Sequence, residues 1–314
     1  MKITILVCTF NEEVNIKSRI INLASLEQPE NLELEVYILD NGSTDKTYEI
    51  ACNLCNVYDI PIQVCKLGPI GKCASLFWAY ENVDSDYFLM TDANTVFNSS
   101  YVIETVRTIR SNEESMVYIG NFKSVLSSKD GENFLSNNSS MSIRHVVEEY
   151  FNVTSGANGA CYCVNSKSIV DIWKFPAVRN DDFVISVYAF SHGSAKILPR
   201  AKAYEVENLS SLEVFQQKYR DALGHHQAIT WLLNLSFSLK LYLSVILRLI
   251  YWSAFILLTI LFIYLFGWWG FYTLLLAFIL VKRVRRLFLR GFALYVGYIV
   301  GLVKKPEAKW ITER

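Results

Sequence analysis

The sequence predicts an α/β fold with a mostly parallel sheet covered by helices on both faces, followed by a hydrophobic helical region at the C-terminus. In the first part of the chain, short β-branched apolar runs alternate with helical patterns across short connections, which favours parallel strands joined by crossover helices. Across residues 239–303, polar side chains are rare apart from clusters of Lys and Arg. The 314 residues exceed one average domain, so we expect two regions, residues 1–235 and 236–314.

The strands and helices of the first region follow a regular order. Four apolar runs predict buried strands, at Ile3–Thr9, Glu33–Leu39, Ile62–Lys66 and Tyr87–Thr91. Helical patterns lie between them, at Val14–Leu26, Ser43–Cys55 and Gly71–Val83. Ligands of such sheets gather at the carboxyl ends of the strands. The polar residues that follow these strands are therefore candidate binding residues.

Composition restricts the partners and the compartment. The formal net charge is zero, so no overall field attracts nucleic acid. The N-terminal apolar run ends at Asn11–Glu13, which makes it too short for a signal peptide. Seven cysteines, an odd number without the spacing of a secreted disulfide framework, favour a reducing environment. We therefore expect the first region to lie in the cytosol.

Two polar turns follow predicted strands. Asp40–Ser43 joins a strand to a helix, and this arrangement suits a ligand with anionic groups, although a capped turn explains it as well. Asp92 and Asn94 follow the fourth strand. Oxygen ligands two residues apart point the same way in an extended chain and suit a hard cation, but a single D-x-N pattern is common by chance.

Two further segments carry charged candidates. Lys72 opens a predicted helix, where its ammonium would contact the phosphates or ribose of a ligand. The preceding Gly68–Gly71 lacks the spacing of a phosphate-binding loop, which excludes an ATPase of that kind. Asp181 and Asp182 open an apolar helical stretch, where they serve either as caps favoured by the helix dipole or as a general base.

Seven segments along residues 2–224 occur in a characteristic order: Cys8–Glu13, Leu39–Asp45, Gly71–Lys72, Thr91–Asn94, Gly156–Ala160, Asp181–Phe183 and Ala203–Glu205. Together they resemble the family-2 glycosyltransferases, inverting enzymes with the Rossmann-like GT-A fold, and most closely their cellulose-synthase-like branch. The resemblance implies transfer of a hexose-type sugar from a UDP-sugar to an acceptor.

The resemblance also implies roles on the donor side. Thr9, Phe10 and Glu13 would line the nucleotide-sugar pocket, with the ring of Phe10 stacked on the pyrimidine. Asp40 would accept a hydrogen bond from the uracil N–H, and Lys72 would contact the diphosphate or ribose.

Further roles concern the reacting groups. Asp92 and Asn94 would hold Mg²⁺ or Mn²⁺, which stabilises the charge of the leaving diphosphate. Asp181 and Arg220 would also contact the donor. Asp182 would act as the catalytic base that removes a proton from the acceptor hydroxyl.

Two positions depart from the family pattern. Asn94 stands where many relatives carry the second acid of D-x-D, so the metal site loses one charge. Gln217 and Arg220 match part of the Q-x-x-R-W motif of processive synthases, but Asp221 replaces the aromatic residue. A single transfer is therefore favoured over polymer synthesis. A processive synthase acting as an oligomer, and a non-catalytic nucleotide-sugar-binding subunit, remain alternatives.

The C-terminal region predicts membrane attachment. Leu241–Phe266 is long enough to cross a hydrocarbon core of about 30 Å. Gly267–Gly270 indicates a turn with interfacial tryptophans, and Phe271–Val281 returns as a shorter leg. The basic cluster 282–286 belongs on the cytosolic side, which places both ends of a hairpin over residues 241–281 with the first region.

The last apolar segment and the short return leg leave several arrangements open. Residues 287–303 predict an interfacial helix or a third membrane segment. The short return leg is compatible with a tilted hairpin, a locally thinned bilayer or a re-entrant segment. A buried helical core domain is the alternative to a membrane-bound region. An enzyme anchored in this way, by a hairpin or by several passes, would meet lipid-linked or polysaccharide acceptors.

Overall fold

The computed structural model describes residues 1–137, 143–150, 154, 156–169, 180–206, 212, 215–219, 221–224, 228–229, 239–280, 289, 292–293, 296–297 and 300. These residues form two units. The first contains the described residues up to Val206 except Asn180. The second contains Asn180 and the described residues from Leu212 onward.

Four parallel strands form one half of an eight-stranded sheet. The strand β1 (Lys2–Thr9) lies between β2 (Glu33–Asp40) and β4 (Tyr87–Asp92), and β3 (Ile62–Lys66) lies outside β2. All four strands were predicted from apolar runs within one residue of these bounds, and all are confirmed.

The other half of the sheet is mixed. From β4 the order continues through β7 (Tyr162–Asn165), β6 (Ser115–Val125), β8 (Ser194–Val206) and β5 (Thr95–Phe97). Strands β6 and β8 are parallel, whereas the pairs β4–β7, β6–β7 and β5–β8 are antiparallel. The prediction of a mostly parallel sheet is therefore not confirmed. The regular alternation of strand and helix that predicts parallel pairing ends at β4, and the later apolar runs do not specify strand direction.

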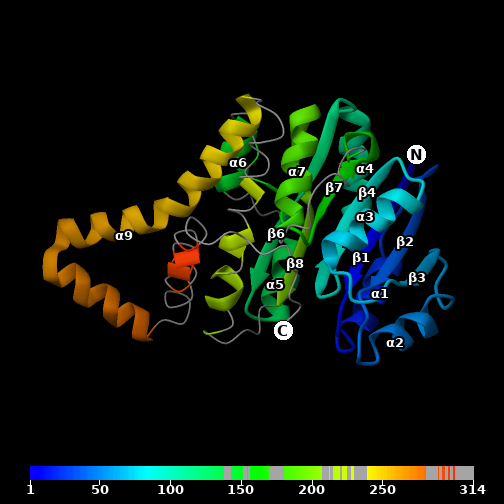
Figure 1. Cartoon of the computed structure of the whole chain (residues 1–314), viewed down its shortest axis with the longest axis horizontal. Coiled ribbons are helices and arrows are strands. Elements are labelled where there is room, and N and C mark those ends of the chain that lie inside the picture. The colour runs from blue at the N-terminus through cyan, green and yellow to red at the C-terminus, as the bar shows by residue number, and fades with distance from the viewer. Residues whose placement is uncertain are drawn as a thin grey trace. The chain divides into compact units, whose positions relative to one another are not determined.

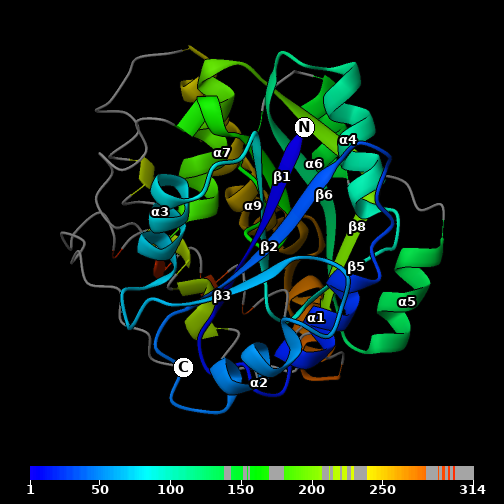
Figure 2. The ribbon, with the colours of Figure 1, turned by 90° about the vertical axis from the view of Figure 1, so that its right-hand side faces the viewer.

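Helices cover both faces of the sheet, as predicted. The helices of the first unit are α1 (Ile16–Ala24), α2 (Thr47–Leu54), α3 (Lys72–Asn82), α4 (Tyr101–Ser111), α5 (Ser128–Ser136), α6 (Ile143–Tyr150) and α7 (Asp181–His192), with the short 3₁₀ helix η1 (Ser166–Ile169). In Figure 2, α3 and α7 lie on one side of the sheet, and α1 and α4 lie on the other.

Side-chain alternation along β4 explains this division. Leu89 belongs to the core formed with α1, α2 and α4. The neighbouring Phe88 points to the opposite face, where its ring centroid lies 5.0 Å from that of Tyr80 on α3. Because successive residues of a strand face opposite sides, a single apolar run supplies both layers of the core.

The strand register brings the polar strand ends to one edge. Thr9 is paired with Asp40, Asp40 with Lys66, and Cys8 with Asp92. These residues end or nearly end their strands, so the turns that follow lie at the same edge. This is the edge at which the sequence predicts a ligand.

Arg19 of α1 holds the connection between β4 and β5. Its buried guanidinium donates to Oγ1 of Thr91 at 2.7 Å and to the carbonyl oxygen of Thr95 at 2.8 Å. It also lies 4.3 Å from the centre of the Phe97 ring. Asn22 accepts from the Arg19 guanidinium and from the Phe97 amide. A buried guanidinium is tolerated only with such partners, so these contacts fix α1 against the turn that carries Asp92.

The second unit contains the long apolar helix α9 (Leu239–Leu280), which bends at Gly267 (φ 54°, ψ −140°) and forms two legs (Figure 1). Its stretch Leu257–Leu276 is long and apolar enough to cross a membrane, and only 6% of it is buried. Within the described part of the chain this is the one such helix, so the prediction of several membrane passes is not confirmed. The basic cluster 282–286 lies outside the described residues, as does most of the segment 287–303.

Candidate active site

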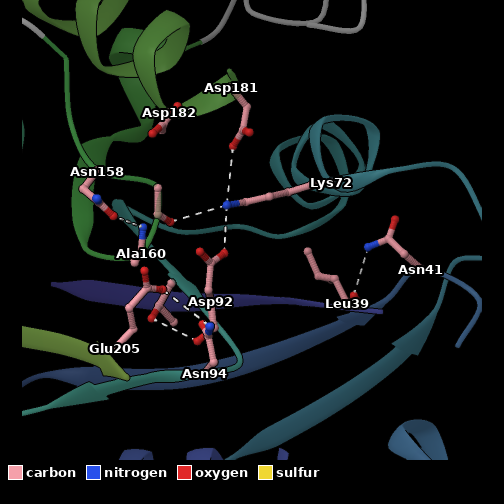
Figure 3. A network of polar contacts seen from close by, with 12 residues as sticks. Leu39, Asn41, Lys72, Asp92, Asn94, Asn158, Ala160, Asp181, Asp182 and Glu205 are labelled. Carbon is pink, nitrogen blue, oxygen red and sulfur yellow. Dashed lines mark hydrogen bonds and ion pairs between the residues drawn. The ribbon is translucent and has the colours of Figure 1, made fainter. Parts of the chain in front are cut away.

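Three distant segments bring charged side chains together at the carboxyl edge of the sheet (Figure 3). Lys72, the first residue of α3, donates through Nζ to Oδ1 of Asp92 at 2.8 Å. The same Nζ lies 4.0 Å from Oδ2 of Asp181, the first residue of α7. It also lies 3.5 Å from the carbonyl oxygen of Gly159. Lys72 is therefore placed between two carboxylates.

Burial and mutual charge determine the protonation of this group. Burial raises the pKa of the Asp181 carboxyl to about 6. Lys72 opposes this rise, whereas the charges of Asp182 and Asp92 add to it. Burial lowers the pKa of the Lys72 ammonium, but the carboxylates of Asp92 and Asp181 outweigh burial and hold this pKa well above its usual value. Oδ2 of Asp181 is buried and accepts no hydrogen bond. The group thus favours a cation between its carboxylates.

Asp182 lies beside the same group and is half-buried. A β-carbon added to Gly159 would lie 3.4 Å from Oδ2 of Asp182 and 3.1 Å from Nζ of Lys72. The absence of a side chain at Gly159 therefore lets both groups approach this loop. Oδ1 of Asp182 accepts from the Phe183 amide at 2.8 Å. Asp182 thus combines solvent access with a position close to the charged cluster.

The loop Gly156–Ala160 is held in place by α7. The amide of Ala157 donates to Oγ of Ser186 at 2.8 Å, and the amide of Ala160 donates to Oδ1 of Asn158 at 2.9 Å. Gly156 has φ +94°, a conformation that favours glycine, and a β-carbon there would lie 2.5 Å from the Phe183 ring. These contacts set the position of Gly159 relative to Asp182.

Asp40 ends β2 and is fully buried. Its carboxylate accepts from the Ser43 hydroxyl and from the amides of Gly42 and Ser43. The turn is therefore capped, which was one of the two interpretations of Asp40–Ser43 from the sequence; the other was a ligand-binding turn. A carboxylate has about four acceptor positions, so these three bonds leave capacity for one further donor. Thr9 is also buried beside this turn, and its carbonyl oxygen accepts from the Asn41 amide at 2.9 Å.

Phe10 and Glu13 lie in the loop after β1. Phe10 is half-buried. Glu13 is exposed, its amide donates to Oδ2 of Asp45, and its own Oε2 accepts from the Lys46 amide, each at 3.1 Å. Glu13 thus links this loop to the start of α2, a connection that the sequence pattern did not predict.

Asn41 connects the turn after β2 to the helix that carries Lys72. Its Oδ1 accepts from Oγ of Ser75 at 2.7 Å, and the same hydroxyl also bonds to the carbonyl oxygen of Gly71. Figure 3 shows Asn41 with its amide nitrogen toward the Leu39 carbonyl. Asn41 therefore fixes the first turn of α3, a function that its place after a strand did not reveal.

Asn94 lies next to an acid from a distant strand. Its Nδ2 is 3.5 Å from Oε2 of Glu205, which also accepts from Ser124 through Oε1 at 3.2 Å. Antiparallel pairing of Thr95 with Glu205 produces this proximity. The sequence does not predict a role for Glu205, although the Ala203–Glu205 motif is a usable signal. Arg220 lies outside the described residues.

The donor groups at this edge fit a small divalent cation that is shared with a substrate. Mg²⁺ is commonly held by one or two carboxylates together with substrate phosphates, at near-octahedral geometry. Asp92 and the hydrogen-bond-free Oδ2 of Asp181, which both lie near Nζ of Lys72, are oxygen donors of this kind. Asn94, two residues after Asp92, carries a further amide oxygen. Among the described residues, no group of three or more His, Cys, Asp or Glu side chains forms a complete metal site.

Comparison with known proteins identifies the family. A model described as "Glycosyl transferase family 2" matches residues 4–164, and one described as "Glycosyl transferase family group 2" matches residues 87–284. The chain belongs to glycosyltransferase family 2. The family predicted from the ordered motifs is thereby confirmed, and the protein is a glycosyltransferase. The assignment to the cellulose-synthase-like branch stays a prediction.

Solved structures share the fold of this glycosyltransferase. Mannosyltransferase PcManGT from Pyrobaculum calidifontis, in complex with GDP-Man and Mn²⁺, has a TM-score of 0.67 and 17% identity over 96% of this chain and 86% of that chain. S. aureus TarS 1–349 has a TM-score of 0.57 and 15% identity, over 81% and 72%. Its complex with UDP-GlcNAc has a TM-score of 0.57 and 16% identity, over 81% and 73%. A GT-A-like α/β fold is thus confirmed.

The raised pKa of Asp181 predicts a pH-dependent stability. Because its value of about 6 in the folded enzyme exceeds the usual 3.8, the folded state binds more protons than the unfolded state between these pH values. The stability contributed by this residue therefore falls as the pH rises through that window. Asp181→Asn cannot titrate. We expect its thermal midpoint, relative to that of the wild type, to increase between about pH 4.5 and about pH 7.

Thermal unfolding followed by circular dichroism in detergent measures this difference. The exposed Asp84 provides a matched control, since Asp84→Asn removes a carboxyl of the same kind from the surface. A difference between Asp181→Asn and the wild type that is the same at both pH values contradicts the prediction.

Proposed function

We propose that this glycosyltransferase moves a sugar from a UDP-sugar to a membrane-associated acceptor, lipid-linked or polysaccharide, with inversion at the anomeric carbon. The observation that carries the proposal is the meeting of Lys72, Asp92 and Asp181 at the carboxyl edge of the sheet, with the half-buried Asp182 beside them.

On the donor side, the charged group suits a nucleoside diphosphate. Asp92, Asn94 and Asp181 would hold Mg²⁺ or Mn²⁺ together with the diphosphate oxygens. The cation, when bound, supplies Lewis-acid stabilisation of the departing diphosphate. Lys72 adds a positive charge that is already directed at this position. The GDP-Man and Mn²⁺ of the PcManGT complex and the UDP-GlcNAc of the TarS complex support a donor of this chemical class.

The nucleoside would lie at the ends of β1 and β2. Phe10 offers a half-buried ring for stacking on a base, and the neighbouring Thr9 would line the same pocket. Asp40 would accept a base N–H through its remaining acceptor position. Glu13 and Arg220 stay proposed donor contacts from the family resemblance, with Glu13 in the supporting loop.

On the acceptor side, Asp182 is the proposed general base. Its carboxylate takes the proton of the acceptor hydroxyl while that oxygen attacks the anomeric carbon. The new glycosidic C–O bond forms as the bond from the anomeric carbon to the β-phosphate oxygen breaks, and UDP leaves with the electron pair. Attack occurs opposite the leaving group, so the configuration inverts.

Residues 1–235 form the proposed cytosolic catalytic domain, and residues 236–314 form its membrane anchor. The described surface of α9 supports this division, because large apolar side chains around its bend are exposed: Tyr264, Leu265, Phe266, Trp268, Trp269, Phe271 and Tyr272. Aromatic residues of this kind favour the membrane–water interface. An anchored enzyme would meet acceptors that are themselves held at the bilayer.

Activity is tested with the full chain in detergent. UDP-glucose, UDP-galactose and UDP-N-acetylglucosamine, each with Mn²⁺ and polyprenyl phosphate, should show UDP release from at least one donor. We expect Asp182→Asn to lower kcat by about a hundredfold or more, because the acceptor proton loses its base. The affinity for UDP with Mn²⁺ should stay within about twofold of the wild type.

Asp84→Asn, at an exposed position, should retain the wild-type kcat and controls for the loss of one carboxylate. A normal rate with Asp182→Asn removes the proposed base. UDP binding without turnover of any donor favours the non-catalytic binding subunit instead.

Membrane attachment is tested by charging the exposed face of α9. Leu258 and Leu261 are 64% and 49% exposed, so Arg at both positions leaves packing intact. Each Arg costs about 3 kcal/mol at the centre of a bilayer, and the double variant should lose flotation with phosphatidylcholine–phosphatidylglycerol vesicles. Val14→Arg with Val57→Arg charges two exposed apolar positions of the first unit and should float like the wild type. Equal flotation of the two double variants contradicts an anchor in α9.

A further inference from the structure

The ammonium of Lys72 lies where the proposed cation would bind. Its Nζ is 2.8 Å from Oδ1 of Asp92 and 4.0 Å from Oδ2 of Asp181, two of the oxygens assigned to the metal. A divalent cation would approach such oxygens to about 2.1 Å. Two cations that share the same oxygen repel strongly in a partly buried site. The ion pair and the metal therefore compete for Asp92.

The backbone beneath Lys72 is fixed, whereas its side chain is flexible. The hydroxyl of Ser75 bonds to Asn41 at 2.7 Å and to the carbonyl of Gly71 at 3.1 Å, which anchors the first turn of α3. The Lys72 side chain is 18% exposed, and its four-carbon stem rotates freely compared with a guanidinium fork. Rotation of this side chain would take Nζ off Asp92 while the anchored turn stays in place.

The charges favour such a movement when a diphosphate arrives. Asp92 and Asp181 face Lys72, and the amide of Asn94 adds no charge, so the ammonium cancels one of the two negative charges that lie directly against it. A divalent cation alone then meets a weakly negative site. A diphosphate brings further negative oxygens that attract both the ammonium and the metal. Asp182 and Glu205 lie nearby but have other contacts, to the Phe183 amide and to Asn94 and Ser124.

We propose that Lys72 is a mobile counter-ion that occupies the cation position while no donor is bound, and that the diphosphate draws it off Asp92 and so opens this position to the metal. This inference rests on the proposed function. It makes the binding of metal and diphosphate cooperative, because each removes an obstacle to the other. Lys72 then occupies the cation position before the donor binds and contacts the diphosphate after it binds.

The test measures Mn²⁺ binding by electron paramagnetic resonance of the free ion, without nucleotide and with UDP. Lys72→Met and Lys72→Gln both remove the charge. The Gln variant keeps a hydrogen-bond donor for Asp92, so it serves as the test protein if the Met variant folds poorly. Both should bind Mn²⁺ alone at least about tenfold more tightly than the wild type. In both, UDP should increase the Mn²⁺ affinity by a smaller factor than in the wild type.

Lys2→Met is the matched control. Lys2 is also ion-paired, with Nζ 3.0 Å from Glu35 and 24% side-chain exposure, but it lies at the amino end of β1, where the sheet has no proposed site. Its Mn²⁺ affinity should equal that of the wild type.

Unchanged or weaker binding of Mn²⁺ alone in both Lys72 variants overturns the inference, because the ammonium would then not compete with the metal. If the wild type still releases UDP from a donor, that result leaves the proposed function standing. If the wild type neither binds UDP nor releases it, the proposed function fails. In that case, the comparison of nucleotide-free Mn²⁺ binding between the wild type and the Lys72 variants still decides whether Lys72 competes with the metal.

Discussion

The ion pair between Lys72 and Asp92, with Asp181 4.0 Å away, is the interaction on which the rest of the site depends. It joins the start of α3, the end of β4 and the start of α7, which are far apart in the sequence. Partly buried charges are stable only when their partners are in place, so this group forms only when all three elements have docked. In the proposed function, the same group would attract a sugar-nucleotide diphosphate and its cation to this edge.

The end of β4 is held from both faces of the sheet by positive charge. Thr91 points toward α1, where it accepts from the guanidinium of Arg19, and Asp92 points toward α3 and Lys72. Alternation along the strand makes this possible within two residues. The Asn41–Ser75 bond and the Gly156–Ala160 loop then position the flanking helices. Because these elements are fixed, exchange of the Lys72 ammonium for a divalent metal would require only the Lys72 side chain to move.

The sequence was informative where local patterns report on structure directly. Apolar runs predicted β1 to β4, and the rule for strand ends predicted that Asp40 and Asp92 would share an edge. The direction of β6, β7 and β8 could not be predicted, because pairing between distant strands leaves no local pattern. The sequence does not predict the role of Arg19, because an Arg in a helix usually faces solvent, and its partners Thr91 and Thr95 lie more than 70 residues away. Asp40 illustrates a further limit, since a capped turn and a ligand contact use the same residue types.

The account centres on one claim: the carboxylates at the end of β4 and the start of α7 share a divalent cation with the donor diphosphate. The most direct measurement is a structure of the full chain with UDP and Mn²⁺, in which anomalous scattering locates the manganese. The account predicts one manganese peak in contact with Asp92 and a diphosphate oxygen, with Nζ of Lys72 moved from Asp92 to the diphosphate. Manganese and UDP bound away from this edge, or a diphosphate seated there with Lys72 still paired to Asp92, would contradict it.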